Sequence, residues 1–486
     1  MQTKTVTFIS IILGCVCIVA IISLCILGPV LHHMIDTQSR LAPGSLTFKQ
    51  WSEPDASIFL QFYFFNLTNP REFRNGSKPR VQQWGPYTYR ERRFKLNVEI
   101  DRSNDTISYK EIKQYFFVRN LSVGPESDLI TTVNIVYLTL TNKAGTNKYF
   151  AYILELVSKY FGEQLTLQRS VGELIWGYDD PLLNFLKTHH FPVNTSKVGL
   201  YADKNNTDDG TTIIVLGDKN RDNRGNILSV RGSRSLSCWS SPSANQINGS
   251  DGSLFHPFLK PEESIFVFSM DICRSIEFVH VEPAIVHGIP CRKYLPSEDT
   301  LDSPLENFKN RGFCLHWPNC YGRGVLDLSS CQSGAPVAMS LPHFTHADQM
   351  YLDAVIGLHP SAEFNTTFFV EPLTGALLHA VKKLQLNANV TKNPTFRELT
   401  NVSTALIPIA FVNESVTLDS ATARILRDSL VLTPLIIKAV SGAMLFGALA
   451  TIFICAVFFL YKRRIDRTNA ETRPLLSDAD SQPIYS

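Results

Sequence analysis

Two long apolar runs lie near the ends of this chain. Val6–Leu27 and Ala439–Leu460 contain no charged residue. Each is long enough to cross a bilayer core of ~30 Å as a helix that rises ~1.5 Å per residue. The pattern predicts an uncleaved anchor at residues 6–27, a second span at 439–460, short tails at 1–5 and 461–486, and one domain at 28–432.

Between the spans, many segments alternate apolar and polar residues with the period of a β-strand. Leu384–Val390 places apolar residues on one face and amides on the other, which is typical of a half-solvated antiparallel strand. Further segments are rich in β-branched and aromatic residues and also predict strands. They are Thr211–Leu216, Ser264–Phe268, Ile276–Val281 and Thr367–Val370.

Residues 149–186 break the alternation and predict helices. Tyr149–Gly162 is apolar nearly all round, and its closing glycine suits a helix C-cap. Ser170 and Glu173 have the spacing of a capping box at the start of a second helix, Ser170–Leu186. We therefore expect an ectodomain of α+β type, mainly β, with a helical subdomain inserted in it.

The apolar helix has two interpretations that the sequence leaves open. It belongs to the core, or it forms an exposed surface that binds a protein or a lipid, since large exposed apolar patches usually mark interaction sites. In the second case Lys159 would meet a fatty-acid carboxylate or an acidic partner. The candidate binding residues are Tyr149, Phe150, Tyr152, Ile153, Leu156, Lys159 and Tyr160.

Every Asn-x-Ser/Thr glycosylation sequon lies between the two apolar runs, which predicts that this domain faces away from the cytosol. Lys462, Arg463 and Arg464 follow the second run directly and mark that side as cytoplasmic. We therefore expect both termini in the cytoplasm. The candidate glycan acceptors are Asn66, Asn75, Asn104, Asn120, Asn194, Asn205, Asn248, Asn365, Asn389, Asn401 and Asn413.

Six cysteines gather within one hundred residues of the ectodomain. An even cluster in an oxidising compartment predicts disulfides, although spacing alone does not choose among about 15 pairings. Zinc binding is disfavoured because the cluster contains no Cys-x-x-Cys pair. The six are Cys238, Cys273, Cys291, Cys314, Cys320 and Cys331.

The chain shows no sign of an enzyme or of a nucleic-acid-binding protein. Its formal charge of +2 lacks the basic excess that nucleic acid requires, and the common hydrolase and phosphate-loop motifs are missing. His343 and His346 with Asp348 suggest a metal site, but a polar turn is favoured. Asp179 and Asp180 suggest glycosidase carboxylates, but a solvated loop explains them equally well. We expect no catalytic residue, metal or cofactor.

The C-terminal tail carries an acidic dileucine pattern. Glu471 lies four residues before Leu475 and Leu476, and Pro474 keeps the segment extended. Two leucines can enter an apolar pocket while the carboxylate meets a basic patch, as in signals read by clathrin adaptors. The alternative is a chance pair of leucines, and the signal is favoured.

All twelve histidines lie between the spans, where an acidic lumen would charge some of them. His189 and His190 are the best candidates for a pH sensor. Ordinary surface or core histidines are the favoured alternative.

Several segments resemble the class B scavenger receptor family, also called the platelet glycoprotein IV or fatty acid translocase family. They occur in the family's order from one span to the other, and the tail is most similar to that of the lysosomal member. The matching segments are Gln61–Pro70, Gly85–Glu91, Glu173–Asp180, Ile247–Phe258, Asp271–Ile276, Ser340–Phe344 and Glu371–Gly375.

The resemblance implies an irregular antiparallel β-barrel, an apical helical bundle near residues 149–186 and an apolar tunnel. It also implies disulfides Cys273–Cys331 and Cys314–Cys320, which leaves Cys238–Cys291 as a third bridge. The lysosomal member carries a histidine at the start of its first bundle helix. This chain carries Lys148 at that position.

The expected function is that of a lysosomal and late-endosomal membrane glycoprotein. The resemblance implies a receptor for a luminal hydrolase such as β-glucocerebrosidase, and a conduit for cholesterol, phospholipid or fatty acid. A clathrin adaptor and a second copy in a homodimer are the other expected partners. The alternative is a plasma-membrane scavenger receptor for lipoproteins or long-chain fatty acids.

Overall fold

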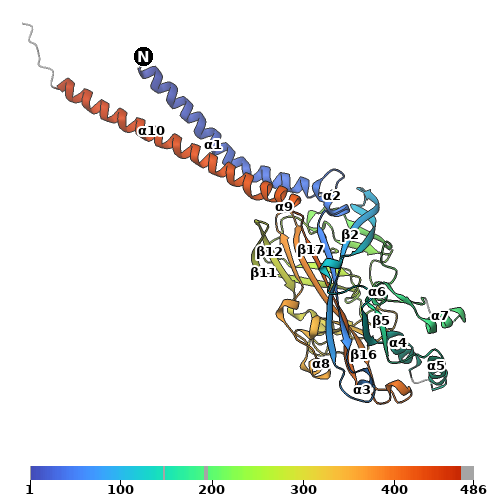
Figure 1. Ribbon diagram of the computed structural model, residues 1–486. Helices are drawn as coiled ribbons and strands as arrows, with labels where there is room; N and C mark the ends of the chain where they lie inside the picture. Colours follow the sequence, from blue (N-terminus) through green and yellow to red (C-terminus); the bar gives the residue numbers. More distant parts are fainter. Residues whose placement is uncertain (1, 146–147, 191–194, 472–486) are drawn as a thin grey trace, which may run out of the picture. The chain divides into compact units, whose positions relative to one another are not determined.

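The chain divides into two compact units. One contains both ends of the chain, Met1–Met34 and Ile425–Ser486, and the other is the ectodomain, Ile35–Arg424. Figure 1 shows the elements of each unit coloured along the sequence. The computed structural model describes residues 2–145, 148–190 and 195–471.

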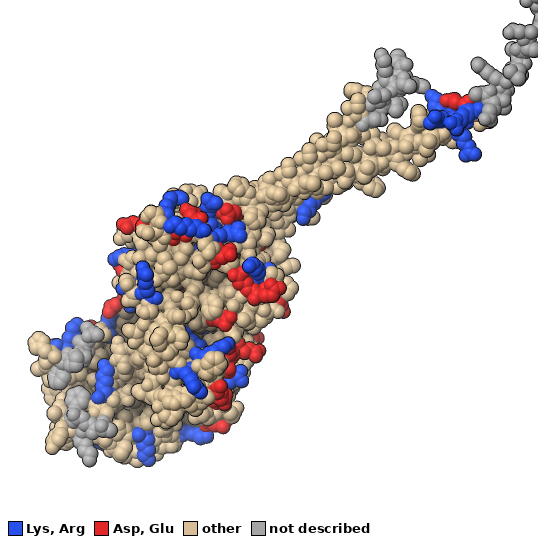
Figure 2. Space-filling view, turned by 180° about the vertical axis from the view of Figure 1, so that it is seen from behind, with Lys and Arg blue, Asp and Glu red and all other residues tan. Residues whose placement is uncertain are grey.

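The first unit is helical. Helix α1 covers Gln2–Gln38 and α10 covers Thr433–Glu471, so both are longer than the predicted spans at 6–27 and 439–460. Both are long and apolar enough to cross a membrane. Figure 2 shows few charged side chains along this unit and a basic cluster near the end of α10. Uncharged apolar side chains are compatible with a hydrocarbon environment. A helix is also compatible with it because its backbone hydrogen bonds are made within the helix.

A 13-stranded antiparallel sheet forms the body of the ectodomain. Two short strands, β13 (Val325–Asp327) and β14 (Val337–Ser340), pair with each other, and β14 also pairs with β16. The other strands follow one path. Its order is β10 (Ile265–Ser269), β11 (Arg274–Val286), β12 (Ile289–Pro296), β15 (Thr367–Glu371), β16 (Ala376–Val390), β17 (Ala405–Thr417), β1 (Ser57–Leu67), β2 (Val81–Asp101), β3 (Thr106–Phe117), β8 (Asp208–Val215) and β9 (Ile227–Val230).

The described strands do not close into the expected barrel, because β9 and β10 remain the two ends of the path. A short segment instead hydrogen-bonds to both edges. The amide of Ile227 in β9 donates to Gly249 O at 2.8 Å, while Ser250 N donates to Phe266 O at 3.1 Å in β10. Residues 249 and 250 therefore connect the two edges of the sheet through backbone hydrogen bonds, which leaves fewer edge groups unpaired.

The central strands bury aromatic side chains because β1 alternates along its length. Phe62 and Phe64 are fully buried, with ring centroids 6.4 Å apart, and Phe62 lies edge-on to Tyr89 of β2 at 5.8 Å. Burying a side chain of this size stabilises the fold by roughly 1.5–3 kcal/mol. The same cluster continues to Val136, Leu154 and other side chains of the helical region.

The expectation of a half-solvated strand at Leu384–Val390 is wrong. This segment lies in β16, and its amides Gln385 and Asn387 are fully buried. Asn387 Nδ2 donates to Ser340 Oγ at 3.0 Å, and Gln385 Oε1 accepts from His343 N at 2.7 Å. Since hydrogen bonds satisfy the buried amides, the strand is covered on both faces, which alternation alone does not reveal.

The helical region begins with a two-stranded sheet of β4 (Leu129–Val133) and β5 (Thr166–Ser170). Around it lie α4 (Ile135–Ala144), α5 (Lys148–Tyr160), α6 (Val171–Trp176) and α7 (Pro181–Thr188). The predicted capping box at Ser170 and Glu173 is confirmed, and Gly162 ends the α5 segment with a φ of 70°. The remaining short elements are α2 (Leu46–Ser52), α3 (Pro70–Arg74), β6 (Tyr178–Asp179), β7 (Lys197–Val198), α8 (Gln349–Ala354) and α9 (Ser420–Arg427).

The expectation of a single helix at Ser170–Leu186 is wrong, because the chain breaks between α6 and α7. Gly177 adopts a φ of 99°, which favours glycine, and its amide closes α6 by donating to Glu173 O. Asp180 then accepts from Leu183 N at 2.9 Å, and Pro181 occupies the first turn of α7. An N-cap aspartate followed by proline starts a new helix.

The helical region lies at one end of the sheet. Thr131 N in β4 donates to Asn66 Oδ1 at 2.8 Å, close to where β1 ends. The opposite end of β1 pairs Ser57 with Thr417, next to the residues that lead to the two spans. A strand of this length separates the two ends by roughly 30 Å.

Two disulfides link the ectodomain, Cys273–Cys331 and Cys314–Cys320. The expected Cys238–Cys291 bridge does not form, and both thiols are free. Cys291 is buried in β12 opposite Ala284 of β11, whereas Cys238 packs in a different apolar cluster beside Trp239. The two cysteines therefore belong to separate parts of the core.

Replacing Gly249 by alanine should destabilise the ectodomain strongly. An added Cβ would lie 2.0 Å from Phe266 O, and the φ of +78° disfavours any side chain. We expect a loss of at least about 3 kcal/mol in the free energy of unfolding, measured by chemical denaturation. The Asn248 sequon survives the change.

Gly232→Ala is the matched control, because Gly232 has a φ of +79° but open space around its Cβ position. It should cost only about 1–2 kcal/mol, the strain of the left-handed conformation alone. Equal losses in the two variants would show that the connection between β9 and β10 carries no stability.

Candidate functional site: an apolar helix face and a charged internal cavity

The structure exposes one side of the apolar helix and buries the other. Tyr149, Tyr152, Ile153, Leu156 and Tyr160 all project from one side of α5 and are exposed, Tyr149 to 87% and Tyr160 to 84%. Their spacing of three and four residues places them on one helical face. Lys159, which precedes Tyr160 at the C-terminal end of α5, is also exposed. We call these five aromatic and aliphatic residues the apolar face of α5.

The opposite side of α5 anchors the helix to the ectodomain. Ala151 and Leu154 are buried in the main apolar cluster, and Phe161, just after the helix, packs against Phe185 of α7 at 5.3 Å. Phe185 in turn stacks on His189 at 4.1 Å. Since the inner side supplies the packing, the apolar face is free to contact another molecule.

Two side chains of this helix that the sequence singles out lie outside the described part of the structure. Phe150 and Lys148 lie within α5, but only their backbone positions are described. His189 Nδ1 lies 2.9 Å from Phe185 O, and His190 adopts a φ of 61° at the turn that follows α7. The predicted sensor pair therefore lies directly after α7.

Sequence reasoning missed a cluster of charged side chains on the buried face of the sheet. Arg93 Nη2 lies 2.6 Å from Glu91 Oε1 of its own strand and 2.7 Å from Glu414 Oε1 of β17. Lys95 Nζ lies 3.1 Å from Glu111 Oε2 across β2 and β3. Charged residues at alternate positions of a strand usually indicate a solvated face, so the sequence pattern of β2 did not predict that these side chains are buried.

The charged cluster continues across a small cavity with a volume of about 30 Å³. Lys382 of β16 lies 3.0 Å from Asp271 Oδ2, and Lys204 lies 3.6 Å from Asp271 Oδ1. This cavity differs from the apolar tunnel implied by the family resemblance, because charged and hydroxyl groups dominate its walls. The lining residues are Leu60, Glu91, Lys113, Tyr115, Tyr201, Lys204, Thr207, Asp209, Asp271 and Glu414.

Burial and pairing act differently on the acids of this cluster. Burial raises the pKa of Glu91, and the nearby Arg93 and Lys113 offset it only in part. Burial also opposes ionisation of Glu414, but Arg93, Lys382 and Lys113 outweigh it and hold the pKa below its usual range. Lys382 and Lys204 hold the pKa of Asp271 far below its usual range. On acidification, Glu91 therefore takes up a proton before the other two acids.

His343 is the centre of a buried neutral network. His359 N donates to His343 Nδ1 at 3.1 Å, so the other ring nitrogen carries the proton and donates to Gln83 Oε1 at 2.7 Å. A second proton on Nδ1 would oppose the His359 donor. Burial, together with the neighbouring His359, lowers the pKa of His343 to about 4.

The other candidate ligands and acids do not converge on a site. His346 is exposed and bonds to Asn365, while Asp348 Oδ2 accepts from Arg323 N at 2.8 Å. Asp180 caps α7. Among the described residues, no three histidine, cysteine or acidic side chains gather closely enough to hold a metal.

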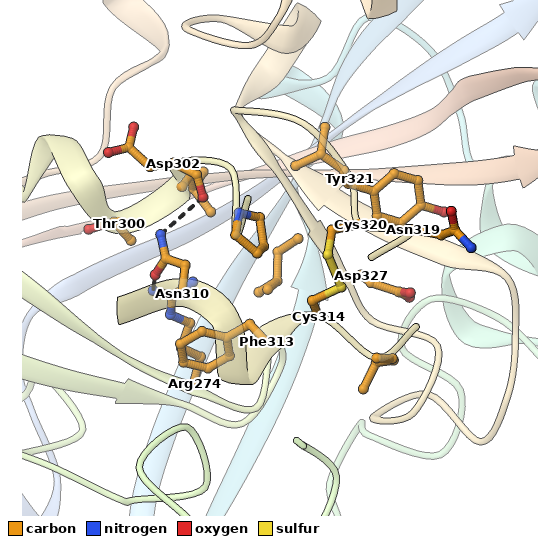
Figure 3. Close-up of a pocket in the computed structure, with 15 residues that line it drawn as sticks. Arg274, Thr300, Asp302, Asn310, Phe313, Cys314, Asn319, Cys320, Tyr321 and Asp327 are labelled. Atoms are coloured by element: carbon orange, nitrogen blue, oxygen red, sulfur yellow. Dashed lines mark hydrogen bonds between the residues drawn. A yellow bond between two sulfur atoms is a disulfide. The ribbon is translucent and has the colours of Figure 1, made fainter. Parts of the chain in front are cut away.

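A second cavity, with a volume of about 20 Å³, lies beside the Cys314–Cys320 disulfide (Figure 3). The Arg274 guanidinium stacks on Phe313 at 3.8 Å and donates to Asn310 Oδ1 at 2.9 Å. Burial lowers the pKa of Arg274 to about 10, so it stays charged at neutral pH. This arrangement holds the disulfide loop against the sheet and offers no nucleophile with an adjacent base.

The candidate glycan acceptors differ in accessibility. Asn413 Nδ2 donates to Gln61 Oε1 at 2.9 Å within the sheet, so its amide is engaged. Asn66, Asn365 and Asn389 are half-buried. Asn194 lies outside the described residues. The exposed acceptors are Asn75, Asn104, Asn120, Asn205, Asn248 and Asn401.

These features define a membrane protein with two apolar terminal helices and a large, disulfide-linked, mixed α and β ectodomain. The family model described as the CD36 family matches residues 11–459. The chain therefore belongs to the CD36 family.

The chain is similar to proteins named as lysosomal membrane proteins and as class B scavenger receptors. The chain is 37% identical over 430 residues to lysosome membrane protein 2 of Homo sapiens, covering 87% of this chain and 88% of that protein. The Mus musculus protein of that name is 36% identical over 430 residues, with the same coverage. Scavenger receptor class B member 1 of Bos taurus is 32% identical over 425 residues, covering 86% of this chain and 82% of that protein. These names describe membrane proteins and receptors, not enzymes.

His343 should make the ectodomain less stable as the pH falls from about 6.5 to about 4. In this window the histidine of the unfolded chain, with its usual pKa of ~6.5, is protonated, whereas the buried histidine of the folded chain stays neutral. The difference is worth about 3 kcal/mol at pH 4. Denaturant titration of the wild type and His343→Gln should show a shallower pH dependence in the variant.

The exposed His346 provides the control. Stability should vary with pH in His346→Gln as it does in the wild type. If His343→Gln retains the full wild-type slope, the buried network is not the cause of that pH dependence.

Proposed function

We propose that this chain is a lysosomal and late-endosomal receptor with both termini in the cytoplasm. In this proposal the apolar face of α5 binds a luminal hydrolase of the β-glucocerebrosidase kind. The interior of the ectodomain passes lipid, and the dileucine tail directs sorting. The exposed apolar face of α5 is the observation that carries the proposal.

The apolar face fits a protein partner in both size and chemistry. Tyrosine supplies large contact area at low entropic cost, and the face carries Tyr149, Tyr152 and Tyr160 around Ile153 and Leu156. Such a face on a glycoprotein surface would favour aggregation unless a partner used it. In this proposal the helical region, which lies at the end of β1 away from Ser57, is the apical bundle that a large soluble enzyme contacts.

The tail supports sorting through its sequence and its separation from the span. Helix α10 extends to Glu471, and Leu475 and Leu476 follow outside the described residues. The basic stretch after Tyr461 fits the cytoplasmic face of a membrane. Both observations agree with a short cytoplasmic segment at 461–486 that an adaptor can reach.

The lipid-conduit part of the proposal draws on the family resemblance and on the chemistry of the side chains inside the ectodomain. Aromatic side chains border the charged cavity on one side, where Tyr115 contacts Tyr201 at 5.8 Å. Beyond Lys95 of the charged cluster, Trp51 packs against Tyr109 at 5.0 Å. A molecule with an apolar body and a polar head, such as cholesterol, a phospholipid or a fatty acid, would contact these aromatic side chains with its body and the charged side chains with its head. Glycans on the exposed acceptors would shield the sheet from luminal proteases.

The alternative function is a cell-surface scavenger receptor for lipoproteins or long-chain fatty acids. The similarity to scavenger receptor class B member 1 favours it, as does Lys159 beside the apolar face. Steady-state surface labelling separates the two functions, because a lysosomal receptor leaves only a small surface pool.

Changing Ile153 to aspartate should weaken hydrolase capture without unfolding the ectodomain. The Ile153 side chain is 55% exposed, so the substitution should change the free energy of unfolding by no more than about 0.5 kcal/mol. A carboxylate at this position would have to lose its hydration when a partner covers it, which weakens binding. Binding of purified β-glucocerebrosidase to the full-length receptor, measured by surface plasmon resonance, should weaken at least about tenfold.

Met350→Asp is the matched control, since Met350 is a 65% exposed apolar residue on a different helix, α8. Its affinity for the hydrolase should equal that of the wild type. Unchanged binding in Ile153→Asp would remove α5 from the proposed receptor surface.

Changing Leu475 and Leu476 to alanine should move the receptor from lysosomes to the cell surface. The variant loses the apolar pair that enters the adaptor pocket while the rest of the tail is unchanged. Imaging with a lysosomal marker and surface biotinylation measure the redistribution. Ile484→Ala, an apolar change elsewhere in the tail, should leave the distribution unchanged, and lysosomal accumulation of the dileucine variant would contradict the sorting role.

A further inference from the structure

One edge of the large sheet carries both of the chain's connections to the spans. A row of paired residues crosses neighbouring strands at this edge and shows how they align. Its members are Lys293 in β12, Phe369 in β15, His379 in β16, Thr417 in β17 and Ser57 in β1. Past this row, the chain before Ser57 leads back to the first span, and the chain after Thr417 leads on to the second. Strand ends that pass the row therefore belong to the edge where the ectodomain joins both spans.

The β11–β12 hairpin extends well past this row. Ile289 begins β12 and precedes Lys293 by roughly 13 Å of strand. Val286 pairs with Ile289, so the turn consists of His287 and Gly288, whose φ values are 51° and 76°. A two-residue turn with positive φ at both positions matches the twist of its strands. The sheet therefore holds the tip of the hairpin in a defined place.

The tip of this hairpin exposes apolar side chains. Ile285 is 75% exposed, and Pro290, directly opposite it on β12, is exposed as well. The segment 283–291 contains no acidic residue, lysine or arginine. Ile289 and Cys291 are buried and anchor the other face of the hairpin to the core. The outer face therefore presents apolar groups to its surroundings.

The turn between β15 and β16 exposes a second apolar side chain at the same edge. Leu373 is 39% exposed, and its carbonyl oxygen accepts from Phe258 N at 3.0 Å. The guanidinium of Arg221 stacks on the Phe258 ring at 4.6 Å and lies 3.8 Å from Asp36 Oδ1. Since the ectodomain begins at Ile35, these contacts connect the turn to the point where the chain enters the ectodomain.

The length of α1 brings this edge close to a bilayer. The apolar stretch of α1 continues past residue 27 to Leu31, and Asp36 follows five residues later, roughly 8 Å along the helix. The head-group layer on each side of a bilayer is roughly 5–7 Å thick. The two lengths nearly match, so the chain can place Asp36 at the surface of the head-group layer.

A second copy of the chain or another protein fits this edge less well. Past Phe278 the outer side of β11 has no partner among the described strands, because β10 starts opposite that residue. Pro283 lacks an N–H, and the register shifts between His280 and Glu282, so a strand from another chain would pair poorly. A stable protein interface also needs roughly 800 Å² from each partner, far more than these few side chains supply.

We propose that the β11–β12 tip and the β15–β16 turn form a membrane contact, in which Ile285 and Leu373 enter the head-group layer of the bilayer that the spans cross. Apolar side chains gain free energy when they leave water for this layer, and the tip carries no lysine, arginine or acid that would lose hydration there. The contact gives the ectodomain a third attachment besides its two covalent connections. The inference goes beyond the proposed function, since it requires only that α1 and α10 cross a membrane.

The test uses the full-length protein in nanodiscs of palmitoyl-oleoyl phosphatidylcholine. The photoreactive residue p-benzoylphenylalanine replaces Ile285, the sample is irradiated, and the digested chain is analysed by mass spectrometry. We expect a phosphatidylcholine adduct on the peptide that contains position 285. The probe is apolar and occupies an exposed position, so it should leave the fold intact.

A second measurement tests whether the two side chains enter the bilayer together. With the probe in place of Leu373, the further change Ile285→Asp should lower the yield of lipid adduct at least about fivefold, because a carboxylate is disfavoured in the membrane. Ile285→Val keeps an apolar side chain and should leave the yield unchanged.

Ile356 is the matched control position. It is 45% exposed and forms a bridge with Arg80, directly before Val81 of β2 pairs with Leu67. Since Leu67 ends β1 and Ser57 begins it, Ile356 is an exposed apolar residue at the opposite end of the sheet. The probe in place of Ile356 should give no lipid adduct.

Each result has a defined meaning. Lipid adducts at positions 285 and 373 but not at 356 support the contact, as does the lower yield in Ile285→Asp. Adducts to a second copy of the chain, no adduct at position 285, or equal lipid adducts at 285 and 356 overturn it. An unchanged yield at position 373 in Ile285→Asp also overturns it. If Ile285→Asp unfolds, which its melting curve will show, the comparison of positions 285 and 356 decides alone.

The membrane contact and the proposed function fail separately. Hydrolase capture and lysosomal sorting are measured in the same Ile285→Asp protein and should equal those of the wild type. A hairpin that gives no lipid adduct therefore leaves the receptor role standing, and failed hydrolase capture leaves the membrane contact standing.

Discussion

The pairing of charges on the inner face of the sheet is the constraint on which the ectodomain depends. Arg93 in β2 contacts Glu414 in β17 across the intervening strand β1. Leaving one such charge unpaired in the interior costs several kcal/mol. A shift of one residue in any of these strands would turn its charged side chains to the other face of the sheet and leave their partners unpaired. The charges therefore specify the register, whereas the aromatic cluster beside them supplies most of the apolar burial.

The same charges divide the interior into chemically different zones. Phe62 and Tyr89 lie on one side of them, while Trp51 and Tyr109 lie on the other, with the Lys95 ammonium 4.9 Å from the Trp51 ring. A purely apolar molecule would lose contact with apolar walls in the charged zone. An amphiphile would keep favourable contacts with both kinds of zone.

Stable packing and an exposed apolar surface coexist in α5 because different sides of one helix provide them. Ala151 and Leu154 face the core, and Phe161 ties the end of the helix to Phe185 of α7. The sheet beneath has its own polar interior, where His343, Gln385 and Asn387 satisfy one another without net charge. A rigid body of this kind can present an apolar face without rearranging to bury it.

The sequence by itself determined the features that depend on local order along the chain. Uncharged runs, sequons and the capping box at Ser170 gave the spans, the expected topology and a helix start, and the strand segments were placed by their alternation. Only the tertiary structure decided which face of each element is buried. It exposed Tyr149 and Tyr160, buried Gln385 and Glu91, and kept Cys238 apart from Cys291. The reason is that periodicity records two faces of a strand or helix, but what covers each face depends on residues hundreds of positions away.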